Sequence, residues 1–234
     1  YNAMIAPLGH YALRGALWYQ GESNTGEPET YQALLTGLMA DWRRQFGNAL
    51  PFLIVQLPNY GKLASVPEES GWAEVREAQR QAVARDSHAG LAVTIDIGDA
   101  HNLHPTNKQD VGRRLALAAR HVIYEESIAP SGPMALSARR ADGQVVVDFG
   151  DVADHLVAFS HDTPIGFELC GDAPRTCQFA EARIEGKAVL VGRTGTAASR
   201  VRYCWADSPI CTLFDTAGLP AGPFEIRISG SAAR

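Results

Sequence analysis

Long apolar runs are missing from this sequence, and no stretch approaches the roughly 20 consecutive apolar residues of a transmembrane helix. Internal repeats, low-complexity tracts and long runs of like charge are missing too. Positive charge is not in excess, because the net charge is −5 and the pI is about 5.8, so nothing electrostatic predicts nucleic acid or an anionic membrane as a partner. What remains is a globular composition: 234 residues, 46% of them hydrophobic, enough for one large domain or two small ones.

Cysteine is scarce, and its placement is informative. The four cysteines form two pairs of identical spacing, Cys170 with Cys177 and Cys204 with Cys211. The spacing is not C-x-x-C, and no histidine spacing indicates zinc. Two disulfides that close short loops are therefore predicted, which places the protein in the periplasm or outside the cell. The alternative is a cytosolic protein with free buried thiols.

The first half of the chain alternates short apolar strands with amphipathic helices, which predicts a parallel sheet of the α/β class. The predicted strands are residues 12–19, 51–57 and 91–95, the predicted helices are 29–46, 71–85 and one with Pro105 in its first turn, and residues 1–9 are expected to finish an earlier helix. Leu34, Leu35 and Met39 are among the residues expected on the buried face of the first complete helix. Three strands alone would leave apolar faces exposed, so further strands of a flavodoxin-like sheet are expected from a missing amino-terminal part.

The second half changes to short strands separated by turns, beginning after a loop at residues 128–132. Strands are predicted at 144–149, 156–160, 165–170, 178–184, 188–191, 200–205 and 224–228. Asp142-Gly143 and Gly186-Lys187 are hairpin-like turn signals. The expected organisation is an α/β domain over residues 1–128 followed by a small antiparallel β-sandwich over 133–234.

Polar residues concentrate in two loops that each follow a predicted strand. The second of these loops contains His104, with Asp96, Asp99 and Asn102 nearby in sequence. Such loops lie at the carboxyl edge of a parallel sheet, where open α/β folds place their chemistry. A histidine oriented by a neighbouring carboxylate can take a proton from a serine hydroxyl and return it to a leaving alcohol, so His104 is the first catalytic candidate.

The first polar loop contains Gln20, Gly21, Glu22 and Asn24, which are candidate substrate-binding residues. A tight turn with glycine can direct backbone N–H groups and a side-chain amide at one point, as an oxyanion requires. The alternative is a purely structural turn that begins the next helix. Ser23 in the same loop is a weaker candidate nucleophile, because it lacks a Gly-x-Ser-x-Gly turn.

A metal site and a sugar-stacking site are weaker alternatives for other residues near these loops. His101 and His104 could bind a metal with Asp96 and Asp99, but their i, i+3 spacing meets only on a helix, and Pro105 favours a loop. No metal is therefore expected. Tyr60 and Trp72 could stack on a sugar ring, and Arg76 and Gln79 are expected to be solvated.

Four segments carry a family resemblance. WYQGESN, DWRRQFG, LPFLIVQL and IDIGDAHNLHPTNKQDVGRRLALAAR resemble the sialate O-acetylesterase family, within the SGNH-hydrolase superfamily of serine esterases. The resemblance implies that His104 is the general base, that the loop at Gln20 to Asn24 is the oxyanion-hole loop, and that no cofactor is needed. Many such enzymes have an aspartate three residues before the histidine, but His101 stands there, so Asp99 is the preferred acid and Asp96 the second choice.

The Gly-Gln-Ser-Asn-Met block that carries the family's nucleophile is not in this sequence. We therefore expect the serine on an amino-terminal segment or partner subunit, and expect this chain alone to be inactive. The function implied is removal of acetyl groups from sugars, either sialic acids or acetylated polysaccharides. The alternative is a noncatalytic carbohydrate-binding or accessory chain.

Overall fold

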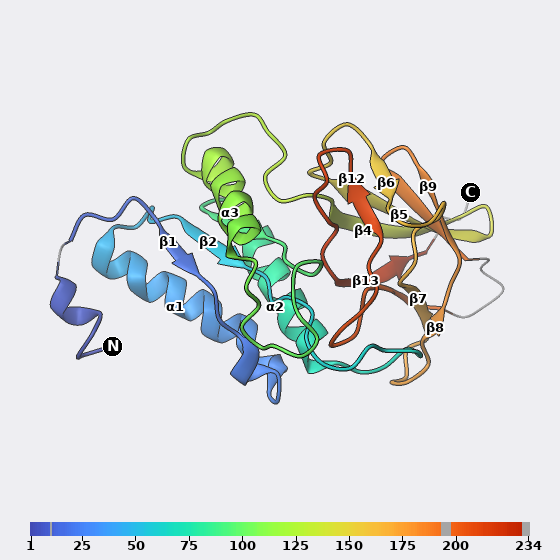
Figure 1. Ribbon diagram of the computed structural model, residues 1–234, viewed down its shortest axis with the longest axis horizontal. Coiled ribbons are helices and arrows are strands. Elements are labelled where there is room, and N and C mark those ends of the chain that lie inside the picture. The colour runs from blue at the N-terminus through green and yellow to red at the C-terminus, as the bar shows by residue number, and fades with distance from the viewer. Residues whose placement is uncertain (10, 193–197, 231–234) are drawn as a thin grey trace.

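Three parallel strands form the sheet of the first half: β1 (Ala16–Trp18), β2 (Phe52–Val55) and β3 (Ala89–Ala92). The computed structural model describes residues 1–9, 11–192 and 198–230. Figure 1 shows β1 beside β2. The strand order is β1-β2-β3, and every residue of β2 and β3 is buried. Strands buried on both faces explain the continuous apolar runs in the sequence. The predicted parallel sheet with helices is confirmed, although β3 begins two residues earlier than expected.

The three helices cover both faces of this sheet: α1 (Tyr31–Phe46), α2 (Gly71–Ala84) and α3 (Lys108–Val122). Successive side chains of a strand point to opposite faces. Phe52 and Ile54 accordingly pack in one core with α1 and α2. Leu53 points to the other face, where a Cβ at Gly90 would lie 3.1 Å from both Leu53 and Ala118 of α3.

Two expectations for the helices were wrong at the level of single residues. Helix α3 begins at Lys108 rather than at Pro105, because Asn107 is the N-cap and its side chain accepts the backbone N–H of Asp110. Leu34 is 57% exposed, since the buried face of α1 is formed by Tyr31, Leu35 and Met39.

The amino-terminal residues also differ from expectation. Residues 1–9 do not finish an α-helix. They form turns and one short 3₁₀ helix at Ala6–Leu8, none of whose residues is buried. Without a buried face, three residues of 3₁₀ helix have little to stabilise a longer helix.

The second half is a large curled sheet of eight strands, with a separate two-stranded sheet. The eight-stranded order is β8-β7-β11-β13-β4-β5-β10-β9, and β12 pairs with β6. The bounds are β4 (Met134–Ala141), β5 (Gln144–Gly150), β6 (Leu156–Ala158), β7 (Phe167–Cys170), β8 (Gln178–Phe179), β9 (Ala182–Glu185), β10 (Ala188–Val191), β11 (Arg200–Tyr203), β12 (Leu213–Asp215) and β13 (Phe224–Ser229). Among the described strands of the second half, every pair is antiparallel except β13 with β4.

The two end strands of the eight-stranded sheet, β8 and β9, follow each other directly in the sequence. Strands β8 and β9 are separated only by Ala180 and Glu181. The N–H of Ala180 donates to Phe167 O at 2.9 Å, and the N–H of Gly192 donates to Glu181 O at 2.7 Å, so pairing continues across the short gap. The curled sheet encloses one apolar core, while β8 and β9 each pair with a single strand among those described.

The predicted hairpins and disulfides are present. Asp142 and Gly143 have φ of 46° and 73° between β4 and β5, the left-handed conformation of a tight hairpin turn. Cys170 is bonded to Cys177, and Cys204 to Cys211. The sequence analysis missed β4 and β12. Strand β4 is rich in alanine and arginine, which lack a strand signature.

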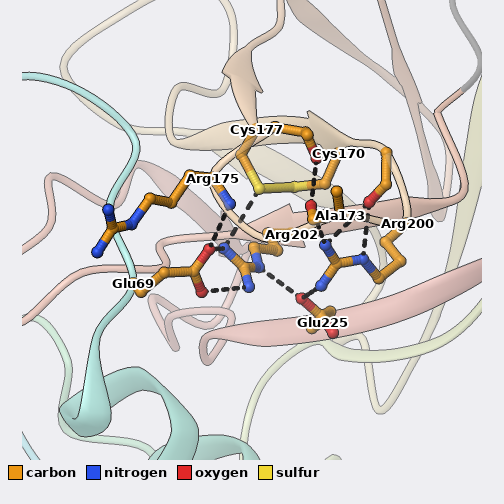
Figure 2. The surroundings of a disulfide bond; sticks show 10 residues. Glu69, Cys170, Ala173, Arg175, Cys177, Arg200, Arg202 and Glu225 are labelled. Atoms are coloured by element: carbon orange, nitrogen blue, oxygen red, sulfur yellow. Dashed lines mark hydrogen bonds and ion pairs between the residues drawn. A yellow bond between two sulfur atoms is a disulfide. The ribbon is translucent and has the colours of Figure 1, made fainter.

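Contacts between the two halves converge on the loop that follows β2. Figure 2 shows Glu69 of this loop beside Arg202 of β11, with an Oε2 to Nη2 distance of 2.9 Å, and the backbone N–H of Arg175 donating to the same carboxylate. Ser70 Oγ donates to Asp207 at 2.6 Å. The predicted domain boundary at residues 128–133 stays a prediction. No helix among the described residues is long and apolar enough to cross a membrane.

Candidate active site

The first polar loop leaves β1 through a position that only glycine fits. Gly21 has φ of 151°, and a Cβ there would lie 3.0 Å from Val75 and 3.3 Å from Leu57. The carbonyl of Gln20 accepts from Tyr31 Oη at 2.7 Å and from Gln79 Nε2 at 3.2 Å. The backbone of this loop is therefore held from below by buried side chains of α1 and α2.

The remaining residues of the loop form one 3₁₀ turn, Glu22–Asn24. Gln20 Nε2 donates to Asn24 Oδ1 at 2.8 Å, and Asn24 N–H donates to Gly21 O at 2.9 Å. The backbone after this turn packs directly against Gly71, the first residue of α2. A Cβ at Gly71 would lie only 1.9 Å from Thr25 O, so this contact requires glycine. This bond leaves both N–H groups of the Asn24 amide and the second N–H of Gln20 Nε2 as donors that can point outward, as an oxyanion site requires.

The second polar loop is held by side chains that bond its own backbone. Asp99 Oδ1 accepts the N–H of His101 at 2.8 Å, and Asn102 Oδ1 accepts the N–H of His104 at 2.9 Å. These two Asx turns shape the chain around the histidines. His104 is exposed, while Pro105 next to it is buried. The imidazole is thus presented to solvent from an anchored backbone.

The two loops following β2 and β3 are also packed together. Gly98 N–H donates to Asn59 Oδ1 at 2.9 Å, and a Cβ at Gly98 would lie 2.2 Å from Asn59 O. Gly61 N–H donates to Ala100 O at 3.1 Å. Because the two backbones are in direct contact, the loop after β2 fixes the position of the loop that contains His104.

Asp96, the second choice for the acid, is engaged elsewhere. Its carboxylate forms a two-point ion pair with Arg114 of α3, at 2.5 and 2.7 Å, and Arg114 also donates to Val93 O. Asp96 is therefore engaged with Arg114 and is not free to bind a metal with His101 and His104, the alternative that the sequence already disfavoured. Across residues 1–9, 11–192 and 198–230, no hydrogen bond or ion pair joins Asp96 or Asp99 to the imidazole of His104.

One contact bridges the two polar loops. The ammonium of Lys108, at the start of α3, lies 4.7 Å from the ring centroid of Tyr19, which precedes Gln20. Burial, followed by the negative charge of Glu22, raises the pKa of Tyr19. Both predicted loops therefore lie at the carboxyl edge of the sheet, and the structure brings their flanking residues into contact.

A buried polar layer under the site was not predicted. Arg76 and Gln79, expected to be solvated, are both 0% exposed. Arg76 donates to the carbonyls of Leu57, Pro58, Ala206 and Asp207, at 2.6 to 2.9 Å. Burial lowers the pKa of Arg76 to about 9. The sequence did contain a sign of this burial. Arg76 and Gln79 each follow an apolar residue, Trp72 and Val75, by four positions, which places them on the buried face of α2.

The aromatic pair Tyr60 and Trp72 is close to that layer. Their ring centroids lie 5.3 Å apart, and Trp72 is only 9% exposed. Trp72 belongs to the core of the first half, so it offers little face to a sugar ring.

Comparisons with known proteins match this arrangement. Residues 1–121, which include both polar loops, match the family model of carbohydrate esterases described as sialic acid-specific acetylesterase. The chain belongs to this family. The predicted resemblance is thereby confirmed, while the assignments of single site residues stay predictions.

The mouse relative and one solved structure match nearly the whole chain, and each is about twice as long as it. The mouse sialate O-acetylesterase is 29% identical over 98% of this chain and 47% of its own length. The human sialate O-acetylesterase is 31% identical over 57% of this chain and 29% of its own. A crystal structure of a carbohydrate acetylesterase from Xanthomonas citri has a TM-score of 0.86 and 38% identity, covering 96% of this chain and 52% of that one. The chain spans about half the length of the mouse enzyme and of the Xanthomonas structure.

Proposed function

We propose that this chain supplies the histidine and the oxyanion loop of a carbohydrate O-acetylesterase, which removes acetyl groups from sialic acids or acetylated polysaccharides. The nucleophilic serine comes from a preceding segment or a partner subunit. The observation that carries the proposal is the family match over residues 1–121, which contains both polar loops.

The free side of β1 supports an amino-terminal contribution. Among the described strands, β1 pairs only with β2, so its other edge has no sheet partner. Leu17, in the middle of β1, is 65% exposed although it lies in an apolar strand. A further strand and helix beside β1 would bury this side chain and satisfy the edge.

The chemistry assigned to these residues is acyl transfer. His104 takes the proton of the serine hydroxyl as the oxygen attacks the acetyl carbonyl, and donors at Gly21 and Asn24 stabilise the oxyanion. His104 then protonates the sugar oxygen as the ester C–O bond breaks. A water, deprotonated by His104, hydrolyses the acetyl-enzyme and releases acetate. Asp99 orients His104 only if it gives up its bond to the His101 N–H or bonds through its other oxygen.

The two disulfides support a location in the periplasm or outside the cell, because such bonds persist in oxidising compartments. We include this location in the proposal.

The test compares acetyl-ester hydrolysis by the 234-residue chain alone and together with the amino-terminal part of its natural gene product. Activity should require the amino-terminal part and fall at least about 100-fold in His104→Ala. His101→Ala is the matched control, since His101 is an exposed histidine of the same loop. Turnover by the 234-residue chain that is lost in Ser23→Ala would overturn the assignment of the nucleophile.

A further inference from the structure

A cavity of about 1010 Å³ lies against β7 and the β8–β9 segment, and Ala64 and Val66 of the loop after β2 complete its lining. None of the predicted site residues of the two polar loops contributes to its lining. It reaches the upper end of the roughly 300 to 1000 Å³ typical of small-molecule sites.

Exposed apolar side chains form the rim of this cavity. Val66, Phe179 and Ile210 line it and are 63%, 53% and 52% exposed. They come from the loop after β2, from β8 and from the loop closed by the Cys204–Cys211 disulfide. Three large apolar groups left in water around one opening indicate a surface that binds a ligand.

Buried polar groups without partners line the same cavity. Glu168 is 2% exposed and Trp205 is 4% exposed, and both line the cavity. Within the part of the chain that the structure describes, neither Glu168 Oε2 nor Trp205 Nε1 has a hydrogen-bond partner. A buried polar atom without a partner costs about 1 to 3 kcal/mol. Both atoms are shielded from solvent, so a ligand in the cavity recovers that cost when the two side chains turn toward it.

The neighbouring arginine explains why Glu168 is unpaired. Arg202 stands directly across from Glu168 in the β7–β11 ladder. Its guanidinium is committed to Glu225 at 2.5 Å and to Glu69 at 2.9 Å, as Figure 2 shows. Burial raises the pKa of Glu168 to about 7, and Glu69, Glu68 and Glu225 add to the rise against the opposing effect of Arg202.

We propose that this cavity is a second binding site of the protein, which takes a neutral saccharide. The apolar faces of sugar rings would lie on Phe179 and its rim neighbours, and hydroxyl groups would reach Glu168 and the indole N–H of Trp205. An anionic sugar fits worse, because the one arginine in the lining, Arg183, lies 3.8 Å from Glu185 and the lining also contains Glu181. This proposal does not rest on the esterase activity.

Glu168 does not form a metal site with the two cysteines near it, neither of which lines the cavity. Glu168 lies close to Cys170 and Cys177, a geometry with metal-ligand character. The two sulfurs are bonded to each other, however, so neither is a thiolate.

Isothermal titration calorimetry of the 234-residue chain tests the proposal, with cellotetraose and xylotetraose as neutral probes. N-acetylneuraminic acid and hexylamine serve as the anionic and cationic comparisons. We expect at least one tetraose to bind at one site per chain, more tightly than either comparison. Phe179→Ala should weaken this binding about tenfold through lost ring contact, and Glu168→Gln about fivefold through a weaker acceptor.

Phe159→Ala is the matched control, because Phe159 is 45% exposed and does not line the cavity. It should leave the affinity unchanged. His104→Ala separates the two proposals, since it should abolish turnover by the extended enzyme while tetraose binding persists. The second site is disproved if no tetraose binds, if hexylamine or N-acetylneuraminic acid binds more tightly than both, or if Phe179→Ala and Glu168→Gln both bind like the unmodified chain.

Discussion

Asp96, in the loop after β3, and Glu168, in β7 of the curled sheet, each have a buried arginine nearby, yet only Asp96 is paired with it. Arg114 meets Asp96 with two bonds, at 2.5 and 2.7 Å. Arg202 lies across the ladder from Glu168 but binds Glu69 and Glu225 instead. The difference lies in the number of carboxylates that compete for each arginine. Arg114 bonds one carboxylate, that of Asp96, whereas Arg202 bonds two others, Glu69 and Glu225, and leaves Glu168 without a bond.

That competition separates the roles of the two regions. In the first half, the carboxylates of Asp96 and Asp99 form bonds that hold the second polar loop in place. In the second half, a carboxyl group is left buried and unbonded beside a cavity. A paired buried carboxylate is a structural group, and an unpaired one is a cost that a ligand can remove.

The largest expected effect is on the join between the regions. Arg76→Met removes donors to four buried carbonyls, two in each half, so it should lower the free energy of unfolding by about 3 to 5 kcal/mol. Urea denaturation measures it. Arg113→Met is the control, because the Arg113 side chain is 75% exposed, and it should change stability by less than about 0.5 kcal/mol. Similar losses in both variants would show that Arg76 does not hold the two regions together.

Loss of a disulfide should lower the stability of the second half more than that of the first. Both disulfides lie in the second half, and each closes a loop with a sequence separation of 7. Cys204→Ser with Cys211→Ser should cost about 2 to 3 kcal/mol through a freer unfolded chain. Hydrogen exchange should rise in the curled sheet and stay constant in β2 and β3. Equal loss of protection in both sheets would mean that the regions unfold as one unit.

Glu168→Gln should change how stability depends on pH. The pKa of Glu168 is about 7 in the folded chain against an ordinary value of 4.5. Between these values the unfolded chain releases the proton and the folded chain retains it, so stability falls as pH rises from about 4.5 through 7. The loss is at most about 3 kcal/mol. Glu168→Gln should remove it, which thermal unfolding at pH 5 and pH 8 measures.

Asp96→Asn is the counterpart of that substitution in the first half. It should destabilise the chain at pH 7 by about 1 to 3 kcal/mol, because Arg114 loses a charged partner while it stays 7% exposed. The two variants should therefore have opposite signs above pH 7. Equal signs would contradict the distinction between the paired and the unpaired carboxyl group.

The smallest effect is expected at the contact that bridges the polar loops. Lys108→Ala removes a cation 4.7 Å from the ring of Tyr19 and should cost about 0.5 kcal/mol. Chemical denaturation against Lys62→Ala, a lysine of the loop after β2, checks it. A loss above about 2 kcal/mol would mean that Lys108 holds the loops more strongly than an exposed contact can.

Short-range patterns predicted much of the fold and the position of the two polar loops after β1 and β3. Apolar runs such as residues 52–55 predicted buried parallel strands, and Asp142-Gly143 predicted a hairpin, because both are local backbone preferences. The polar loops followed from the rule that parallel strands present their carboxyl ends at one edge. Strand β4 was missed because its pairing with β5 and β13, rather than its own residues, makes it a strand.

Charged residues were the least predictable, since their partners lie far away in the chain. Arg76 looked like a solvated helix residue, but two of its acceptors, Ala206 and Asp207, come from the other half. Arg114 gave a usable signal, because it shares the buried face of α3 with Val111 and Ala118. A charged residue in an apolar stripe needs a buried partner, although sequence does not name that partner.

The sequence by itself determined the α/β order of the first half, the antiparallel character of the second, the cysteine pairs and the loop that contains His104. Each depends on neighbours within about a dozen residues. Only the tertiary structure decided that Asp96 pairs with Arg114, that Arg76 is buried between the halves, and that Glu168 lacks a partner beside a cavity. Burial and charge pairing depend on which distant segments meet, and that is set by the packing of the whole chain.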